Sequence, residues 1–236
     1  MKIVVCFKVV TDYDKATLSE MQKGDFSYTK KDFGFFDEGA LELAISYKEE
    51  NPDTIIEALT YGEADEIAIE KLYSLNYDKV TVITGKESTF EPKKIAKALG
   101  DYLKNDDFDL LLTGEMVGPN DSGLLPYYLG KELGIKVIPK VTHFTNSKAY
   151  SEDENSIYEN EFIEKAILVI SNSKKPYLRF PKYKDIEEAK KKKEVLVKSD
   201  ISFDSVKISK NYILKKDAKD IDVSMLLLKI REVKND

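Results

Sequence analysis

The chain has 236 residues and a formal net charge of −6, and this acidic balance argues against a general nucleic-acid-binding protein, which needs a concentrated basic surface. Hydrophobic residues make up 42% and charged residues 34%, interspersed as in a globular protein that buries a core. No run approaches the roughly 18 apolar residues of a membrane span. Because the amino terminus reads as a first strand rather than a signal peptide, we expect a cytoplasmic protein.

The first part of the chain alternates between strand and helix patterns. Strands are predicted at residues 2–8, 54–61, 79–84 and 109–113, and helices at residues 37–50, 64–75, 91–103 and 123–133. Asp65 can cap the second helix, and Pro92 falls in the first turn of the third, where proline is tolerated. This alternation predicts right-handed βαβ units and an α/β fold with a doubly wound, mostly parallel, Rossmann-like sheet.

After Gly134 the pattern changes. Residues 136–145, 148–150 with 156–162, and 166–171 look like strands, and we expect them to extend the same sheet in antiparallel fashion. A loop rich in lysine and proline starts at residue 172, followed by a helical pattern at 185–193 and a tail with a strand-like 201–208 and a helical 222–233. The tail has too few apolar residues for a core of its own. The predicted organisation is an α/β domain of residues 1–196 and a docking C-terminal arm of residues 197–236.

Few side chains of the sequence suit catalysis or metal binding. Cys6 is the one cysteine, so a disulfide within the chain and a cysteine-ligated zinc or iron–sulfur site are excluded, and we expect a small hydrophobe in a strand. His143 is the one histidine, and a structural role is expected. A G-x-S-x-G nucleophile motif is absent. The sequence therefore predicts no catalytic residues, no metal site and no enzyme activity.

The stretch from Gly114 to Pro126 is the most informative part of the sequence. A Gly/Pro/Asn/Asp/Ser cluster follows a strand and precedes a helix, where open α/β sheets bind ligands and main-chain N–H groups attract phosphate. We expect Ser122 to cap the following helix, and Asp121 either to face away from the phosphate or to orient the loop. The loop lacks the P-loop lysine and a G-x-G-x-x-G pattern, so an ordinary strand–helix connection is the alternative.

Two other strand ends are expected at the same edge of the sheet. Lys8, with Asp12 and Tyr13 beyond it, follows the first strand, and Leu59-Thr-Tyr-Gly62 closes the second. In a doubly wound sheet these ends converge with the Gly114 loop. Such convergence predicts a nucleotide site better than any one loop does.

A basic loop and helix occupy residues 179–193. A lysine run usually forms a solvated face, and acidic neighbours dilute this one. Its proline loop, however, carries Leu178, Phe180 and Tyr183, and exposed aromatic side chains near basic residues suit protein docking.

Several motifs together carry a family resemblance. They are Lys8, Val10 and Asp12; Asp37, Glu38, Ala40, Leu41, Glu42 and Ala44; Thr60-Tyr-Gly62; Asp109 to Gly114 with Pro119 to Pro126; and Arg179-Phe-Pro181 with Tyr183, Ile186 and Ala189 to Lys192. In this order they resemble the β subunit of electron transfer flavoproteins, over residues 1 to about 196. The resemblance implies an electron carrier that pairs with an α subunit, which holds the redox-active FAD, and that binds AMP, or a second FAD in electron-bifurcating members.

The resemblance also implies site residues. The implied cofactor-binding residues are Cys6, Lys8, Gly34, Phe35, Phe36, Asp37, Tyr61, Gly62, Gly114, Met116, Val117, Asn120, Asp121, Ser122, Gly123, Leu124 and Leu125. The residues implied to dock a flavin dehydrogenase, such as an acyl-CoA dehydrogenase, are Leu178, Arg179, Phe180, Pro181, Tyr183 and Ile186. The C-terminal arm would then dock on the α subunit.

This chain departs from the family pattern at several positions. Gly34 replaces an asparagine and Leu124 a glutamine, and each change removes side-chain hydrogen bonds worth roughly 0.5–1.5 kcal/mol. Glu63 replaces a proline, and Tyr183 replaces the apolar leucine of the docking loop. Main-chain N–H groups survive substitution, so a phosphate could still be held. Two alternatives remain open: a stand-alone adenine-nucleotide-binding module, and a nucleotide-free structural subunit.

Overall fold

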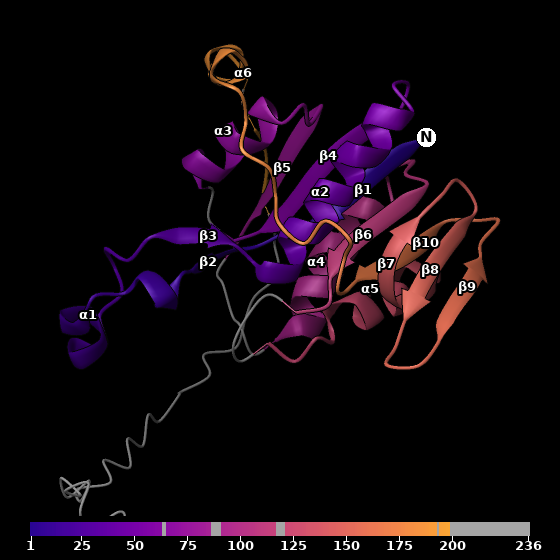
Figure 1. Cartoon of the computed structure of the whole chain (residues 1–236), viewed down its shortest axis with the longest axis horizontal. Helices are drawn as coiled ribbons and strands as arrows, with labels where there is room; N and C mark the ends of the chain where they lie inside the picture. Colours follow the sequence, from indigo (N-terminus) through magenta and orange to yellow (C-terminus); the bar gives the residue numbers. More distant parts are fainter. Residues whose placement is uncertain (63–64, 86–90, 117–120, 193, 199–236) are drawn as a thin grey trace, which may run out of the picture. The chain divides into compact units, whose positions relative to one another are not determined.

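The computed structural model describes residues 1–62, 65–85, 91–116, 121–192 and 194–198, which all belong to the compact unit Met1–Phe203. Figure 1 shows how these elements are arranged. The strands are β1 (Lys2–Cys6), β2 (Val9–Thr11), β3 (Lys31–Phe33), β4 (Ile55–Tyr61), β5 (Lys79–Thr84), β6 (Leu110–Gly114), β7 (Lys136–Phe144), β8 (Lys148–Glu152), β9 (Ile157–Glu161), β10 (Ala166–Ile170) and β11 (Val195–Lys198). The helices are the 3-10 helix η1 (Tyr13–Lys15), α1 (Leu18–Lys23), α2 (Phe35–Glu50), α3 (Glu66–Ser74), α4 (Pro92–Leu103), α5 (Leu125–Leu133) and α6 (Tyr183–Ala189).

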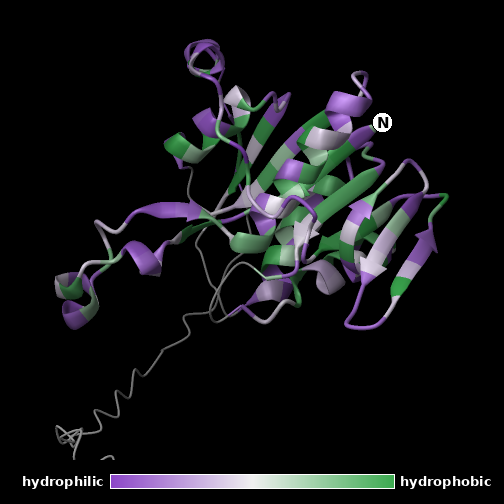
Figure 2. Ribbon diagram, in the orientation of Figure 1, coloured by the Kyte–Doolittle hydropathy of each residue, from purple (hydrophilic) through white to green (hydrophobic). Residues whose placement is uncertain are grey.

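Within the described part of the chain, nine strands form one sheet in the order β11-β5-β4-β1-β6-β10-β7-β8-β9. The strands from β11 to β7 run parallel to their neighbours, and β8 and β9 are antiparallel. The central strands are apolar on both faces (Figure 2), as a parallel sheet covered on both sides requires. Side chains of α2 and α3 share one core with the sheet, and those of α4 and α5 share another. The predicted doubly wound, mostly parallel sheet with an antiparallel extension is confirmed.

The cores follow from the spacing of apolar residues along the helices. Ala96, Leu99 and Leu103 of α4 fall at helical spacing and are buried against the sheet. The predicted caps also occur: the Asp65 side chain accepts a hydrogen bond from the Ala68 N–H, and Pro92 is the first residue of α4.

The prediction for residues 136–171 was wrong in one respect. Strand β10 lies between β6 and β7 and is parallel to both, so only β8 and β9 form the antiparallel extension. The reason is visible in its composition: Ala-Ile-Leu-Val-Ile is buried at every position, which suits a central strand and not a half-exposed extension.

Residues 9–33 form an arm that the sequence did not predict. The first strand ends at Cys6, and β2 and β3 pair with each other in a separate two-stranded sheet that carries η1 and α1 between them (Figure 1). No residue of η1 or α1 is buried.

The C-terminal part differs from expectation too, because β11 pairs with β5 at the edge of the sheet and α6 is displaced from the predicted helix at 185–193. Strand β11 runs to Lys198, two residues past the predicted end of the α/β domain. The predicted strand at 201–208, the helix at 222–233 and the docking of the arm lie outside the described residues.

Candidate functional site

The candidate site lies at the carboxyl ends of β4, β1 and β6, where the order in which the chain adds strands to the sheet reverses. Strand β1 is flanked by β4 on one side and β6 on the other, with Cys6 beside Leu59 and Val5 beside Leu112. Because all three strands are parallel, their carboxyl ends meet at one edge, at the topological switch point where open α/β sheets bind ligands. The predicted convergence of three strand ends is therefore confirmed.

Asp37 ties these strand ends together. Its carboxyl, in the first turn of α2, accepts hydrogen bonds from the N–H of Lys8 (2.9 Å), after β1, and from the N–H of Gly114 (3.2 Å), at the end of β6. Gly34, the N-cap of α2, donates its N–H to the carbonyl of Lys8. Asp37 is buried, and burial raises the pKa of its carboxyl to about 8.

Gly114 and Gly123 are required by the local geometry. A Cβ at Gly114 would lie 2.8 Å from the main-chain N of Asp37 and closer still to its carboxylate. Gly123 has a φ of +65°, which favours glycine, and the carboxylate of Asp121 accepts a hydrogen bond from its N–H (3.1 Å). This hydrogen bond holds the turn at residues 121–123, while the orientation of the whole loop by Asp121 stays a prediction, because residues 117–120 lie outside the described residues.

The predicted cap of α5 was wrong. The helix starts at Leu125, its N-cap is Leu124, and no side chain caps it, so Ser122 does not have that role. Met116 and Leu124 are partly exposed beside this turn. Val117 and Asn120, two further predicted ligands, lie outside the described residues.

Cys6 and Tyr61 are the last residues of β1 and β4, and their side chains are buried in the core. Both are buried in the cluster shared with α4, and burial raises the pKa of the Cys6 thiol. A Cβ at Gly85 would collide with the Tyr61 ring, so this glycine allows the ring to lie there. Gly62, with a φ of +128°, turns the chain out of β4.

Aromatic side chains flank the start of α2. Phe35 is half-exposed and packs edge-to-face on the half-buried Phe36 and on Tyr177, which follows β10 along the chain. These rings give the edge an apolar border of the kind that small-molecule sites use.

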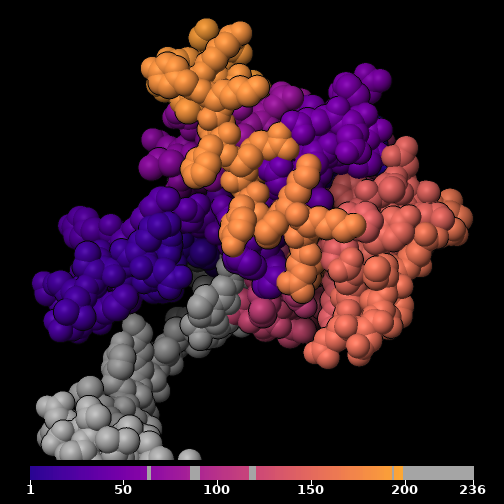
Figure 3. Space-filling view, in the orientation of Figure 1, coloured from indigo at the N-terminus to yellow at the C-terminus, as the bar shows by residue number. Residues whose placement is uncertain are grey.

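The predicted docking loop lies on the face of the molecule seen in Figure 3 and contacts α2 through Arg179, and its residues divide into anchors and exposed side chains. Leu178 is buried, against the expectation of exposure, and Arg179 pairs with the buried Glu42 (Nη2 to Oε1, 2.6 Å) and with Glu49. Phe180 and Tyr183 are exposed, at 90% and 79%. Pro181 and Ile186 are half-buried.

Lys71 of α3 is a residue that sequence reasoning missed. Its Nζ lies 5.1 Å from the centre of the buried Phe33 ring and 5.7 Å from that of Phe180, so one cation contacts both the arm and the docking loop. The interaction joins residues far apart in sequence, and no local pattern could have indicated it.

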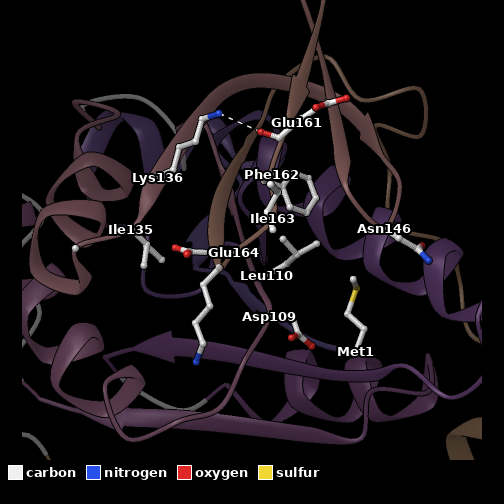
Figure 4. A pocket seen from close by; sticks show the side chains of 12 residues that line it. Met1, Asp109, Leu110, Ile135, Lys136, Asn146, Glu161, Phe162, Ile163 and Glu164 are labelled. Atoms are coloured by element: carbon white, nitrogen blue, oxygen red, sulfur yellow. Dashed lines mark hydrogen bonds between the residues drawn. The ribbon is translucent and has the colours of Figure 1, made fainter.

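A cavity of about 910 Å³ lies at the opposite, amino-terminal edge of the sheet (Figure 4). Met1, Asp109 and Lys136 line it, and none of the predicted ligand or docking residues does. It is separate from the switch-point edge.

The described ranges offer neither a metal site nor a membrane span. No cluster of three or more His, Cys, Asp or Glu side chains there could hold a metal ion, and no helix there is long and apolar enough to cross a bilayer. His143 stacks on Tyr150, with ring centres 4.3 Å apart, and burial lowers the pKa of its imidazole.

Comparison with known proteins adds to this geometry. The family model of the electron transfer flavoprotein domain matches residues 29–197. The chain is 28% identical over 164 residues to the electron transfer flavoprotein subunit beta of Bacillus subtilis (strain 168), covering 66% of this chain and 63% of that protein. It is 21% identical over 154 residues to the Escherichia coli (strain K12) protein YgcR, whose name also describes an electron transfer flavoprotein subunit, covering 61% and 60%. The matched part thus spans less than two thirds of either relative. Since the family model matches most of the chain, this protein belongs to the electron transfer flavoprotein domain family.

Proposed function

We propose that the chain is a β-type electron transfer flavoprotein subunit that binds AMP, or a second FAD, at the edge formed by β4, β1 and β6. The observation that carries this proposal is the junction of three parallel strand ends at the switch point, tied by Asp37. Family membership supports it, because a relative named as a subunit beta matches this chain.

The main chain would do most of the binding. Gly114 and Gly123 let the chain pack closely against Asp37 and Glu115, and other main-chain N–H groups of a loop at a strand end would attract phosphate. The losses at Gly34 and Leu124 remove side-chain contacts only. The half-exposed rings at the start of α2 would border the adenine or another flat group.

The redox partner would be an α-type subunit, whose FAD supplies the electron-transfer chemistry when bound. In that complex this chain would position its nucleotide and present Phe180 and Tyr183 to a flavin dehydrogenase, such as an acyl-CoA dehydrogenase. Leu178 and Arg179 would act as anchors of the docking loop, since one is buried and the other is paired with Glu42.

Two glycine variants test the nucleotide site. Gly123 and Gly134 have nearly the same backbone conformation, with φ of +65° and +68°, but Gly134 lies at the end of α5 with open space around it. Gly123→Val and Gly134→Val should therefore cost similar backbone strain. We expect titration calorimetry with AMP and with FAD to show lost binding in Gly123→Val and retained binding in Gly134→Val. Equal binding in the two variants would contradict the site.

A nucleotide-free structural subunit is the second candidate. It is favoured by Leu124, whose side chain is 44% exposed at the uncapped start of α5, where the family pattern has a polar glutamine. If neither AMP nor FAD binds the wild-type chain or its complex, this candidate replaces the first.

A further inference from the structure

Lys71 of α3 is a partly buried cation that has rings, and no carboxylate, as its close partners within the described residues. Its Nζ lies 5.1 Å from the centre of the Phe33 ring and 5.7 Å from that of Phe180, and it forms no ion pair in the described part of the chain. Asp32 and Glu38 act on it electrostatically but do not pair with it. An ammonium held against ring faces keeps hydrogen-bond donors for a carboxylate of another molecule.

A second contact of the same kind joins α3 to the segment that follows the docking loop. The ammonium of Lys192 lies 5.5 Å from the centre of the Tyr73 ring of α3, and α6 packs against α3 (Figure 1). Arg179 anchors the other end of the loop on Glu42 of α2. The loop and α6 are therefore fixed at both ends, and a surface that is ordered before binding loses less conformational entropy when a partner docks.

The exposed tip of the docking loop, residues 180–184, is apolar and basic. Phe180 and Tyr183 are 90% and 79% exposed, and the tip also contains Lys182 and Lys184 but no acidic residue. Residues 177–192 as a whole carry six basic and three acidic side chains, in a chain whose net charge is −6. This tip complements a partner surface in which carboxylates surround an apolar pocket.

Acidic side chains of α3 and α6 are engaged away from the tip. Glu187 of α6 pairs with Lys190 at 2.7 Å, and Glu70 of α3 interacts with the same lysine. Lys71 and the two lysines of the tip have no ion pair within the described residues, so their charges are available to a partner.

We propose that Lys71 belongs to the docking surface and receives a carboxylate of the partner dehydrogenase while Phe180 enters an apolar pocket beside it. This role rests on the docking function proposed above and adds the chemistry that the partner must present. A charge pair that loses water on docking is stronger than an exposed one, and opposite charges also raise the association rate. Loss of the Lys71 ammonium should therefore weaken binding about tenfold and make association less sensitive to salt.

The test measures binding of an acyl-CoA dehydrogenase from the same organism to the complex of this chain with its α-type subunit. Association rates and dissociation constants are determined for wild type, Lys71→Met, Lys71→Arg and Lys97→Met, from low to physiological ionic strength. Lys97 is the matched control, because it is an exposed lysine of α4, on the other face of the sheet from α3. We expect binding about tenfold weaker in Lys71→Met with a flatter salt dependence, recovery in Lys71→Arg, and wild-type binding in Lys97→Met.

Equal binding by Lys71→Met and Lys97→Met would overturn the inference. A weaker Lys71→Met complex with the salt dependence of wild type would overturn it too, because Lys71 would then act only by holding the Phe180 ring. A Lys71→Arg complex as weak as that of Lys71→Met would likewise contradict a charge pair. If the wild-type complex binds the dehydrogenase at no ionic strength, the proposed docking function fails and the inference fails with it.

Discussion

Replacing Arg179 with methionine should release the docking loop from α2. The guanidinium donates from Nε and Nη2 to Glu42, whose side chain is only 5% exposed, and it also pairs with Glu49. These hydrogen bonds raise the pKa of Arg179, and the pairing lowers the pKa of Glu49. Methionine keeps most of the aliphatic stem and removes every one of these donors.

The size of the effect follows from burial. Removing one partner of a fully buried pair costs about 3–5 kcal/mol, because the remaining charge is left uncompensated. Arg179 is 35% exposed and the main-chain N–H of residue 179 still reaches Glu42, so the cost should be smaller, about 2 kcal/mol. For a chain of this size that lowers Tm by about 4–8 °C.

Urea unfolding monitored by circular dichroism measures this cost. The matched control is Lys190→Met, which removes an exposed pair with Glu187 and should leave the unfolding midpoint nearly unchanged. Adding Glu42→Gln to the arginine variant should recover part of the loss, because the buried charge is gone. If Arg179→Met is no more destabilising than the control, the anchor role is refuted.

Three further outcomes are expected. Gly114→Ala should abolish AMP binding in calorimetry because its Cβ would displace Asp37, whereas Gly134→Ala should leave binding intact; equal affinities would contradict this. Folding raises the pKa of Asp37 to about 8, so the stability that this carboxyl contributes is full below about pH 4 and is lost as pH rises through 8. Between pH 5 and 8, the free energy of unfolding of Asp37→Asn should therefore gain roughly 3 kcal/mol relative to wild type in urea unfolding. A constant difference would show that the group does not titrate there. In a Phe180→Trp reporter, the one tryptophan of the chain, Lys71→Met should lower the fluorescence anisotropy, because the exposed ring loses the cation beside it; unchanged anisotropy would show that this cation does not hold the ring.

The sheet could be predicted from the sequence because its signals are local. Alternating apolar runs and helical spacings identified the elements around β1, β4, β5 and β6, and caps such as Asp65 and Pro92 marked helix starts. Placement of β10 could not be read in this way. Its apolar run indicates a buried strand. Its neighbours, however, depend on the chain returning after β9 to insert β10 between β6 and β7, and no local pattern encodes that step.

The arm formed by residues 9–33 was missed for a different reason. Its strands are three residues long and its helix is six, so apolar periodicity is too short to register. The helix is defined instead by a capping box between Thr17 and Glu20 and by Gly24 in the left-handed conformation. These signals stand in the sequence and would have indicated the helix.

The edge of the candidate site was predicted better than the roles of its side chains. Topology alone brings Lys8, Tyr61 and Gly114 to one edge. The side chain of Phe180 is exposed, whereas that of Arg179 is paired with Glu42. Such differences depend on contacts between residues more than a hundred positions apart in the sequence.

The most direct test of the proposed function is the nucleotide content of the complex with an α-type subunit from the same organism. The two chains are co-expressed and purified together, and the small molecules released on denaturation are quantified by mass spectrometry. We expect one FAD from the partner and one AMP, or a second FAD, per heterodimer, with the second nucleotide lost in Gly123→Val. A complex that releases one FAD and no further adenine nucleotide, or a failure of the two chains to associate, would contradict the account.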